Sequence, residues 1–273
     1  MNYQMKSYYI AYFDILGYKA FFEDKGNDVF AFLESNIQMA NDIIRKTEPD
    51  SVFSDMSFLI KSFSDNFMIL IEDDCKSDGY KEVKALSYLM ALFQLRFLEK
   101  YKILVRGSIT KGDAYINENI VFGEGLIQAV TQEEKANFPR IIIDSEESRI
   151  GKEICDNLLE KCISKDEDDA YYVDFFDILG SSVGFDNEFS TDIDDHLTNL
   201  RKNVVALVKK HGKYVRNVKD PAKIAVAEKT ISKYAWLLTK FNKYCESNAP
   251  KQLIPYSLVL YYRLMRCEIE VKE

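Results

Sequence analysis

Histidine is scarce in this chain of 273 residues, and its scarcity limits the chemistry that the protein can perform. The two histidines, His196 and His211, are too few to favour a histidine-based triad or metal cluster. The five cysteines are scattered and show no CxxC spacing, which fits reduced thiols better than a disulfide frame or a zinc site. Any chemistry is therefore carried by carboxylates, lysine and arginine.

Other features missing from the sequence restrict the cellular location and the binding partners that we expect for the protein. No apolar run approaches the roughly 18–20 residues that span a bilayer, and no basic region followed by an apolar segment opens the chain. The formal net charge is −8 without a strongly basic block, so extended nucleic acid is not an expected partner, and neither is a membrane. We expect a cytoplasmic protein, in which a bound metal can still reverse the local field for a small anionic ligand.

The stretch from Tyr8 to Tyr18 organises the chain. It is an apolar, β-branched and aromatic run in which Asp14 is the one carboxylate, followed by Gly17 and a helical pattern. Such a run predicts a buried strand that feeds a helix. A buried carboxylate is costly unless a cation or hydrogen bonds compensate, so Asp14 requires a reason to be there.

A second stretch, 58–71, repeats this feature. Two apolar runs flank Ser64, Asp65 and Asn66, which predicts a β-hairpin with Asp65 at its tip. If the strands are neighbours, Asp14 and Asp65 converge, with one or two hard cations between them. Paired carboxylates that face a phosphorylated substrate are typical of a magnesium site. We therefore predict that Asp14 and Asp65 bind metal.

The order of predicted elements favours an α+β fold, a ferredoxin-like βαββαβ sheet with extra α/β elements. The other predicted elements are a helix over 17–47, a helix over 80–101, a strand over 103–116 interrupted by two glycines, a strand at 120–122, a helix over 123–137, a strand at 139–144, a helix opened by Glu146 and Glu147, and a strand at 170–179. Two long helices, 191–217 and 221–247, and a short apolar terminal segment follow. We predict a catalytic domain over 1–185 and a C-terminal helical extension over 186–273 that packs on it or mediates oligomerisation.

Four motifs resemble those of the class III nucleotidyl cyclases. They are Phe-Asp-Ile-Leu-Gly-Tyr (13–18), Lys-Ser-Phe-Ser-Asp (61–65), Val-Arg-Gly-Ser-Ile-Thr-Lys-Gly (105–112) and Phe-Gly-Glu-Gly-Leu-Ile-Gln-Ala (122–129), and the resemblance covers about residues 8–145. It implies that Asp14 and Asp65 are catalytic and bind two Mg²⁺ or Mn²⁺ ions, with a backbone carbonyl from Ile15. It also implies a homodimer, since class III sites form between subunits.

The same resemblance implies nucleotide contacts. Gly17 would let the chain approach the triphosphate, and the helix start that follows is a reasonable phosphate cradle. Tyr18 either packs or touches the ligand. Lys61 stands where the family's lysine often contacts the base, although a lysine on an edge strand is commonly a guard against aggregation. For Arg106, a structural ion pair and a ligand contact remain alternatives.

The chain also departs from the family pattern. Ile127 and Thr131 stand where cyclases usually place an asparagine and an arginine, and Ile120 stands where a base-selecting aspartate often lies. Candidates to compensate are Arg106, Lys111, Gln128 and Arg140. The nearest resemblance is to stand-alone bacterial cyclase-like proteins with helical tails, including the pyrimidine cyclases of anti-phage defence.

The leading hypothesis is therefore a metal-dependent cyclase that converts a nucleoside triphosphate to a 3′,5′-cyclic nucleotide and pyrophosphate. One alternative is a degenerate cyclase fold that binds nucleotide as a sensor or scaffold without turnover. Another is a different metal-dependent phosphoryl transferase, such as an oligonucleotide-making polymerase. We interpret Tyr12 as a packing residue and Glu133 to Lys135 as a solvated helix face.

Overall fold

The computed structural model describes residues 4–26, 28–45, 53, 56–75, 78–180 and 193–258. The chain forms two compact units. One comprises Met1–Leu95 with Ile103–Gly184, and the other comprises Arg96–Lys102 with Phe185–Glu273. No helix within the described ranges is long and apolar enough to cross a membrane.

A mixed sheet forms the centre of the first unit. Among the described residues its strands follow the order β2-β3-β1-β4-β6-β8-β7, and β5 pairs with β4 beside this path. All pairings are antiparallel except that of β4 with β6. The strands are β1 (Lys6–Leu16), β2 (Phe58–Phe63), β3 (Asn66–Glu72), β4 (Leu104–Ile116), β5 (Val121–Phe122), β6 (Ile141–Ile143), β7 (Ile163–Lys165) and β8 (Tyr171–Val173).

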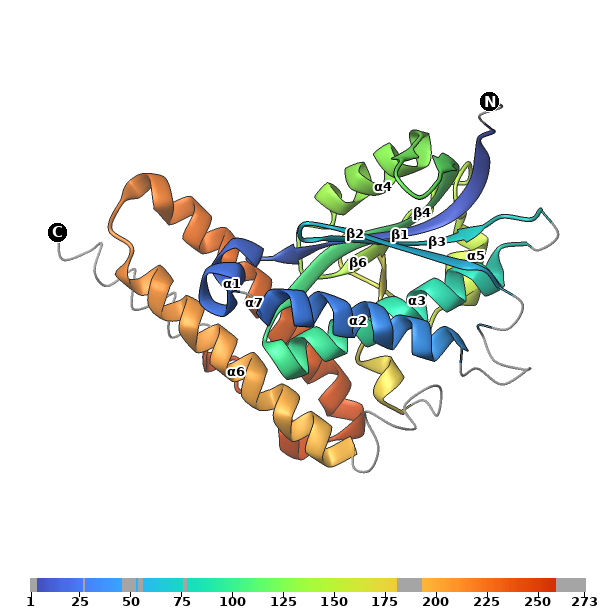
Figure 1. Cartoon of the computed structure of the whole chain (residues 1–273). Helices are drawn as coiled ribbons and strands as arrows, with labels where there is room; N and C mark the ends of the chain where they lie inside the picture. The colour runs from blue at the N-terminus through green and yellow to red at the C-terminus, as the bar shows by residue number, and fades with distance from the viewer. Residues whose placement is uncertain are drawn as a thin grey trace. The chain divides into compact units, whose positions relative to one another are not determined.

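Helices cover both faces of this sheet, and the fold is a mixed α+β fold. Figure 1 shows α4 on one side and α2 with α3 on the other. The helices of this unit are α1 (Tyr18–Lys25), α2 (Asp28–Arg45), α3 (Tyr80–Arg96), α4 (Glu124–Lys135), α5 (Lys152–Asn157) and the 3₁₀ turn η2 (Asp177–Gly180). The predicted strand over 170–179 is shorter than expected, because only β8 pairs and η2 follows it.

The alternation of side chains along β1 separates two apolar layers. Tyr8, Ile10 and Tyr12 face α4 and pack with residues such as Ala129. On the other face the ring of Phe13 stacks on Phe67, with centroids 5.0 Å apart, and Phe93 of α3 lies against both rings. Asp14 therefore lies on the α4 face, in phase with Tyr12.

Glycine explains two differences from the predicted elements. The helix predicted over 17–47 is two helices, because Gly26 takes φ +54°, which glycine tolerates readily, and its N–H closes α1 on the carbonyl of Phe22. The helix predicted to open at Glu146 begins only at Lys152. Residues 146–150 form a turn that ends at Gly151, whose φ is +86°.

The predicted interruption of β4 by glycine is wrong, since the strand runs unbroken through Gly107 and Gly112. A Cβ at Gly107 would lie 2.3 Å from the carbonyl oxygen of Tyr12, and one at Gly112 would lie 2.6 Å from the Cα of Gly125. Glycine at these positions therefore lets β1 and α4 lie unusually close to β4. This close packing fixes α4 over the strand that carries Arg106.

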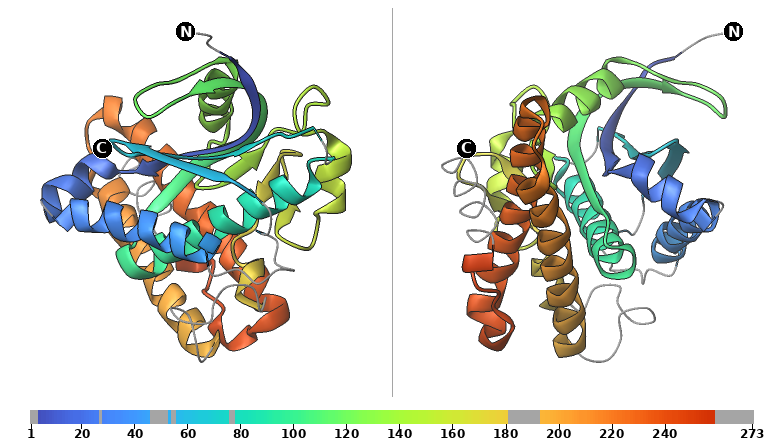
Figure 2. Two further views of the ribbon diagram at one scale, coloured as in Figure 1. Left: turned by 45° about the vertical axis from the view of Figure 1, so that its right-hand side comes forward. Right: turned by 90° about the vertical axis from the view of Figure 1, so that its left-hand side faces the viewer.

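The second unit is a helical hairpin of α6 (Ile193–Asn217) and α7 (Pro221–Asn248), which lie side by side in Figure 2. Asp220 caps α7 by accepting a hydrogen bond from the N–H of Ala222 at 3.0 Å. The side chain of Asn203 donates to the carbonyls of Leu98 and Glu99, which fastens the π-helical turn η1 (Phe97–Tyr101) to α6. Most of the predicted apolar terminal segment lies outside the described residues.

The second unit should lose stability in mild acid. His211 stacks on Tyr234 with ring centroids 4.1 Å apart, and burial, with a smaller effect of Lys210, lowers the pKa of His211 to about 4. Because the pKa in the folded state lies below the ordinary value of 6.5, the stability contributed by neutral His211 is complete above pH 6.5 and is lost as the pH falls through 4. After discounting for partial exposure, we expect a loss of about 1–2 kcal/mol between pH 7.5 and pH 5.

Urea unfolding followed by the fluorescence of Trp236, the one tryptophan of the chain, reports on this unit. A His211→Phe variant keeps an aromatic ring for stacking but cannot take up a proton. Its stability should therefore fall less than that of the wild type over the same pH interval. Equal losses in the two proteins would contradict the assignment.

Candidate active site

Two aspartates meet at one end of the sheet. Asp14 is paired with Asn66 across the β1–β3 ladder, and Asp65 lies in the two-residue turn between β2 and β3. The N–H of Ile15 donates to the backbone carbonyl of Asp65 at 3.1 Å, which fixes the turn against β1. Ser64 takes φ +55°, as tight hairpin turns require. The predicted hairpin with Asp65 at its tip is confirmed.

The carboxyl groups of Asp14 and Asp65 lie near enough to each other for the charge of Asp65 to act on the pKa of Asp14. Partial burial raises the pKa of Asp14 to about 6, and the charges of Asp65 and Glu133 add to this effect. Within the described part of the chain, neither aspartate forms an ion pair with lysine or arginine. The structure thus brings these two residues together as the sequence indicated. Their role in metal binding stays a prediction.

Asn66 and Tyr12 support this pair. The hydroxyl of Tyr12 donates to Oδ1 of Asn66 at 2.5 Å, and Nδ2 of Asn66 donates to Oδ1 of Asp65 at 3.3 Å. Burial raises the pKa of Tyr12 to about 12, with smaller effects of Glu133, Asp14 and Asp65. The phenol therefore stays protonated and keeps its donor role, so Tyr12 does more than pack.

Arg106 and Glu133 flank the aspartates. Arg106 is the direct partner of Asp14 across the β1–β4 ladder, and its Nε donates to Oε1 of Glu133 on α4. The two side chains are 21% and 6% exposed. The interpretation of Glu133 as part of a solvated face is wrong, because it lies on the buried stripe of α4 with Gly125 and Ala129.

These four charged side chains leave an excess of negative charge. The formal charges of three carboxylates (Asp14, Asp65 and Glu133) and one guanidinium (Arg106) sum to −2. Divalent cations bound here would offset this excess. No group of three or more histidine, cysteine, aspartate or glutamate side chains in the described residues is arranged to hold a metal by itself. A cation here would need ligands from backbone, water or substrate.

The other residues predicted to contact the ligand differ in how near they lie to the strand end that carries Asp14. Gly17, exposed and with φ +78°, begins α1 directly after β1, and the half-buried ring of Tyr18 packs against Phe22. Lys61 occupies β2, where its Nζ donates to the backbone carbonyl of Glu118 at 3.3 Å. Ile15 is 1% exposed. Gly17 and Tyr18 continue the strand end that carries Asp14, whereas Lys61 lies two residues from the end of its strand.

Three of the four residues named as compensating candidates are engaged elsewhere. Lys111 lies on the opposite face of the sheet, in an ion pair with Asp73 at 2.7 Å. Gln128 donates to Oδ2 of Asp144 at 2.9 Å. Only Arg106 faces the aspartate pair, since Arg140 belongs to a separate network.

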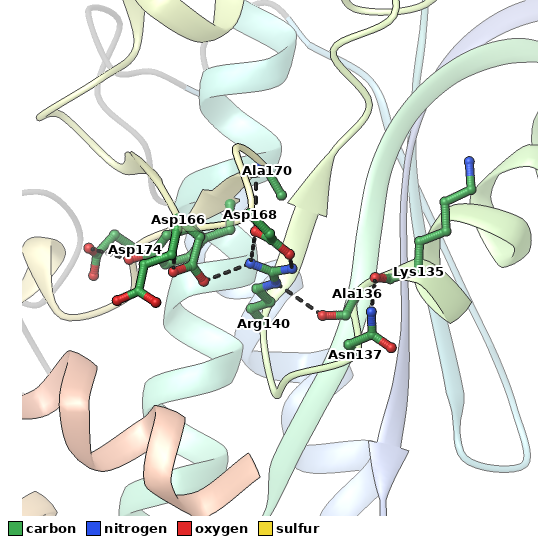
Figure 3. A network of polar contacts seen from close by, with 10 residues as sticks. Lys135, Ala136, Asn137, Arg140, Asp166, Asp168, Ala170 and Asp174 are labelled. Carbon is green, nitrogen blue, oxygen red and sulfur yellow. Dashed lines mark hydrogen bonds and ion pairs between the residues drawn. The ribbon is translucent and has the colours of Figure 1, made fainter. Parts of the chain in front are cut away.

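In that separate network Arg140 is buried and its partners are protein groups. Figure 3 shows Arg140 between Asp166, Asp168 and the carbonyl of Ala136. Its guanidinium donates to Asp166 at 2.6 Å and to both oxygens of Asp168 at 2.9 and 2.5 Å. Arg140 is 1% exposed, so it cannot reach a ligand without breaking these contacts.

The outer face of α4 carries Ile127 and Thr131. Ile127 is 65% exposed, and the hydroxyl of Thr131, also exposed, donates to the carbonyl of Ile127 at 2.8 Å. Neither residue carries the amide with which an asparagine would bind a ribose hydroxyl or the guanidinium with which an arginine would stabilise a phosphate. The exposed face of α4 therefore lacks the chemical groups that the family pattern places at positions 127 and 131.

Comparison with known proteins gives one distant structural match. No family model matches the chain, and no curated protein does. Among solved structures the chain is similar to the adenylyl cyclase CyaB from P. aeruginosa, with 14% sequence identity and a TM-score of 0.45. The match covers 63% of this chain and 96% of that one. At this identity and TM-score the match carries no argument about this chain, and the function proposed below rests on the residues of this chain.

Proposed function

We propose that this protein is a metal-dependent nucleotidyl cyclase, which converts a nucleoside triphosphate to a 3′,5′-cyclic nucleotide and pyrophosphate. The observation that carries the proposal is the convergence of Asp14 and Asp65 at one end of the sheet, where neither forms an ion pair with lysine or arginine among the described residues. Two like charges in a partly buried site are unfavourable unless a cation joins them.

The donor set fits Mg²⁺ or Mn²⁺. These ions prefer oxygen ligands, and magnesium in phosphoryl-transfer sites commonly takes one or two carboxylates and fills its remaining positions with water and phosphate oxygens. Asp14 and Asp65 would hold the ions, two in number in our proposal, together with the backbone carbonyl of Ile15. Bound there, the ions would supply charge neutralisation at the phosphate oxygens.

The chain's own residues then bind and orient the nucleotide. Arg106, beside Asp14, would contact the phosphates, and the backbone around Gly17 and Tyr18 would approach the triphosphate at the start of α1. Lys61 would contact the base. In the reaction the ribose 3′-oxygen bonds to the α-phosphorus, the bond from that phosphorus to the β-phosphate breaks, and the hydroxyl proton passes to solvent.

We extend the proposal to the organisation of the chain. The strand order β2-β3-β1-β4, with helices between β1 and β2 and between β3 and β4, supports a ferredoxin-like core in a catalytic domain over 1–185. Residues 186–273 would be the helical extension. Exposed Leu59 and Phe63, in phase with the α4 face of the sheet, and exposed Ile127 on α4 support a homodimer formed through this face.

A second candidate is nucleotide binding without turnover. It is favoured by the exposed face of α4, where Ile127 and Thr131 supply no cationic group to stabilise a phosphate. For the active enzyme we propose a pyrimidine substrate and a bacterial anti-phage signalling role, since Ile120 offers no carboxylate to select a purine.

One experiment tests both candidates. The purified full chain is incubated with each of the four nucleoside triphosphates and Mn²⁺, and products are identified by mass spectrometry alongside pyrophosphate release. We expect cyclic monophosphate and pyrophosphate in equal amounts from at least one pyrimidine nucleotide. Binding of a nucleotide without product would support the sensor, and oligonucleotide products would support the polymerase-like alternative. If the chain neither bound nor converted any of the four nucleotides, the proposal would be refuted.

A further inference from the structure

The ion pair between Arg106 and Glu133 lies beside the aspartate pair. Arg106 lies opposite Asp14 in the ladder, on the same face of the sheet, so the side chains of these two residues are neighbours. Its guanidinium nevertheless pairs with Glu133 of α4, whose side chain is 6% exposed. A guanidinium binds a carboxylate strongly and often with two hydrogen bonds, so Asp14 is the obvious competing partner.

We propose that Glu133 is a positioning residue that holds Arg106 away from Asp14 and Asp65, and so keeps this carboxylate pair available to a divalent cation. The inference rests on the proposed function, because it assumes that the pair binds metal. Without Glu133, Arg106 would swing onto Asp14 and occupy the place of the cation with a fixed positive charge.

The rigidity of α4 makes Glu133 suitable for this task. The hydroxyl of Ser108 on β4 donates to the carbonyl of Ala129 at 2.7 Å, one turn before Glu133. The close approach of Gly112 to Gly125 anchors the other end of the helix on the same strand. A carboxylate on a helix fixed at two points offers the flexible arginine side chain a stable partner.

A double-mutant cycle on metal affinity tests the proposal. Mn²⁺ alone is titrated into the full chain by isothermal calorimetry, for the wild type, Glu133→Gln, Arg106→Gln and the double variant. We expect Glu133→Gln to weaken Mn²⁺ binding about tenfold, as one released unit charge a few ångströms away would do in a partly hydrated site. Arg106→Gln should change the affinity by less than about threefold, since Glu133 already holds that charge away from the aspartates. The double variant should bind like Arg106→Gln.

The pattern of the four affinities separates this role from two simpler ones. If the charges acted only through their general field, the effects of the single variants would be opposite and would add in the double variant, giving no coupling. If Glu133 only tied α4 to the sheet, the double variant would bind no better than Glu133→Gln. Either pattern would overturn the proposal.

Two controls complete the design. Glu134 lies next to Glu133 but is exposed, so Glu134→Gln makes the same change of charge and should leave Mn²⁺ affinity unchanged. Asp14→Asn should abolish the site. Failure of the wild type to bind Mn²⁺, or equal binding by Asp14→Asn, would count against the proposed function itself. A wild type that binds through Asp14 and a Glu133→Gln variant of equal affinity would refute only the role of Glu133.

Discussion

Replacing Asp14 by asparagine is expected to abolish cyclic nucleotide formation and, at the same time, to stabilise the protein. The activity should fall about 10³-fold or more, because the variant removes one of the two carboxylates proposed to hold the metal ions. Product formed from the preferred nucleotide with Mn²⁺ measures this loss. The backbone of β1 should stay in place, since the side chain of Asn has almost the shape of Asp.

The gain in stability follows from the pKa of Asp14. Burial, with the charges of Asp65 and Glu133, raises this pKa from 3.8 to about 6, so the folded state prefers the neutral acid. The stability contributed by neutral Asp14 is complete below pH 3.8 and is lost as the pH rises through 6. The ionised Asp14 carboxylate therefore lowers the stability of the folded state at pH 7. After discounting for partial exposure, Asp14→Asn should raise the free energy of unfolding at pH 7 by about 1–2 kcal/mol.

Urea unfolding in the presence of a chelator, followed by far-ultraviolet circular dichroism, checks this gain. The difference between the variant and the wild type should shrink as the pH falls from 7 to 4. Asp113→Asn is the matched control, because Asp113 is an exposed carboxylate on β4 away from the aspartate pair. It should alter neither activity nor stability. An Asp14→Asn variant that keeps its activity, or one that is less stable at pH 7, would contradict this interpretation.

Short-range rules predict part of the meeting of Asp14 and Asp65, while the pairing of β1 with β3 enters the prediction only as a condition. A two-residue turn of Ser64 and Asp65 sets the register of β2 and β3, and the alternation of side chains along β1 then decides which face carries Asp14. Both rules act within a few residues and can be applied without knowing the rest of the fold. The same holds for α7, where Asp220 and Pro221 mark the helix start.

The burial of Glu133 shows what such rules miss. Glu133, Glu134 and Lys135 have the composition of a solvated surface, and the partner of Glu133 lies 27 residues earlier on another element. The available signal was spacing: Gly125, Ala129 and Glu133 recur every four residues, and the two small residues mark the face of α4 that packs closely. The expectation that Arg140 could compensate at the site fails for the same reason, because Asp166 and Asp168 are distant in sequence and only the folded sheet brings them together with Arg140.

The largest loss of stability is expected on replacing Arg140 by methionine. Arg140 is 1% exposed, and its guanidinium joins Asp166 and Asp168 while also donating to the carbonyl of Ala136 at 3.0 Å. Methionine fills much of the same volume but leaves the Asp166 carboxylate, 6% exposed, without its guanidinium. Breaking a buried ion pair from one side costs about 3–5 kcal/mol, and we expect Arg140→Met to destabilise the first unit by this amount.

Two further variants show whether the uncompensated charge is the cause. Adding Asp166→Asn and Asp168→Asn to Arg140→Met removes the stranded carboxylates, and this triple variant should recover at least about 1 kcal/mol of the loss. Lys165→Ala is the matched surface control, because Lys165 pairs with Asp169 at 3.1 Å while both side chains are largely exposed. It should change the stability by less than about 0.5 kcal/mol. If the triple variant were no more stable than Arg140→Met, the loss would come from packing around the guanidinium rather than from buried charge, and Arg140 would act mainly through its volume.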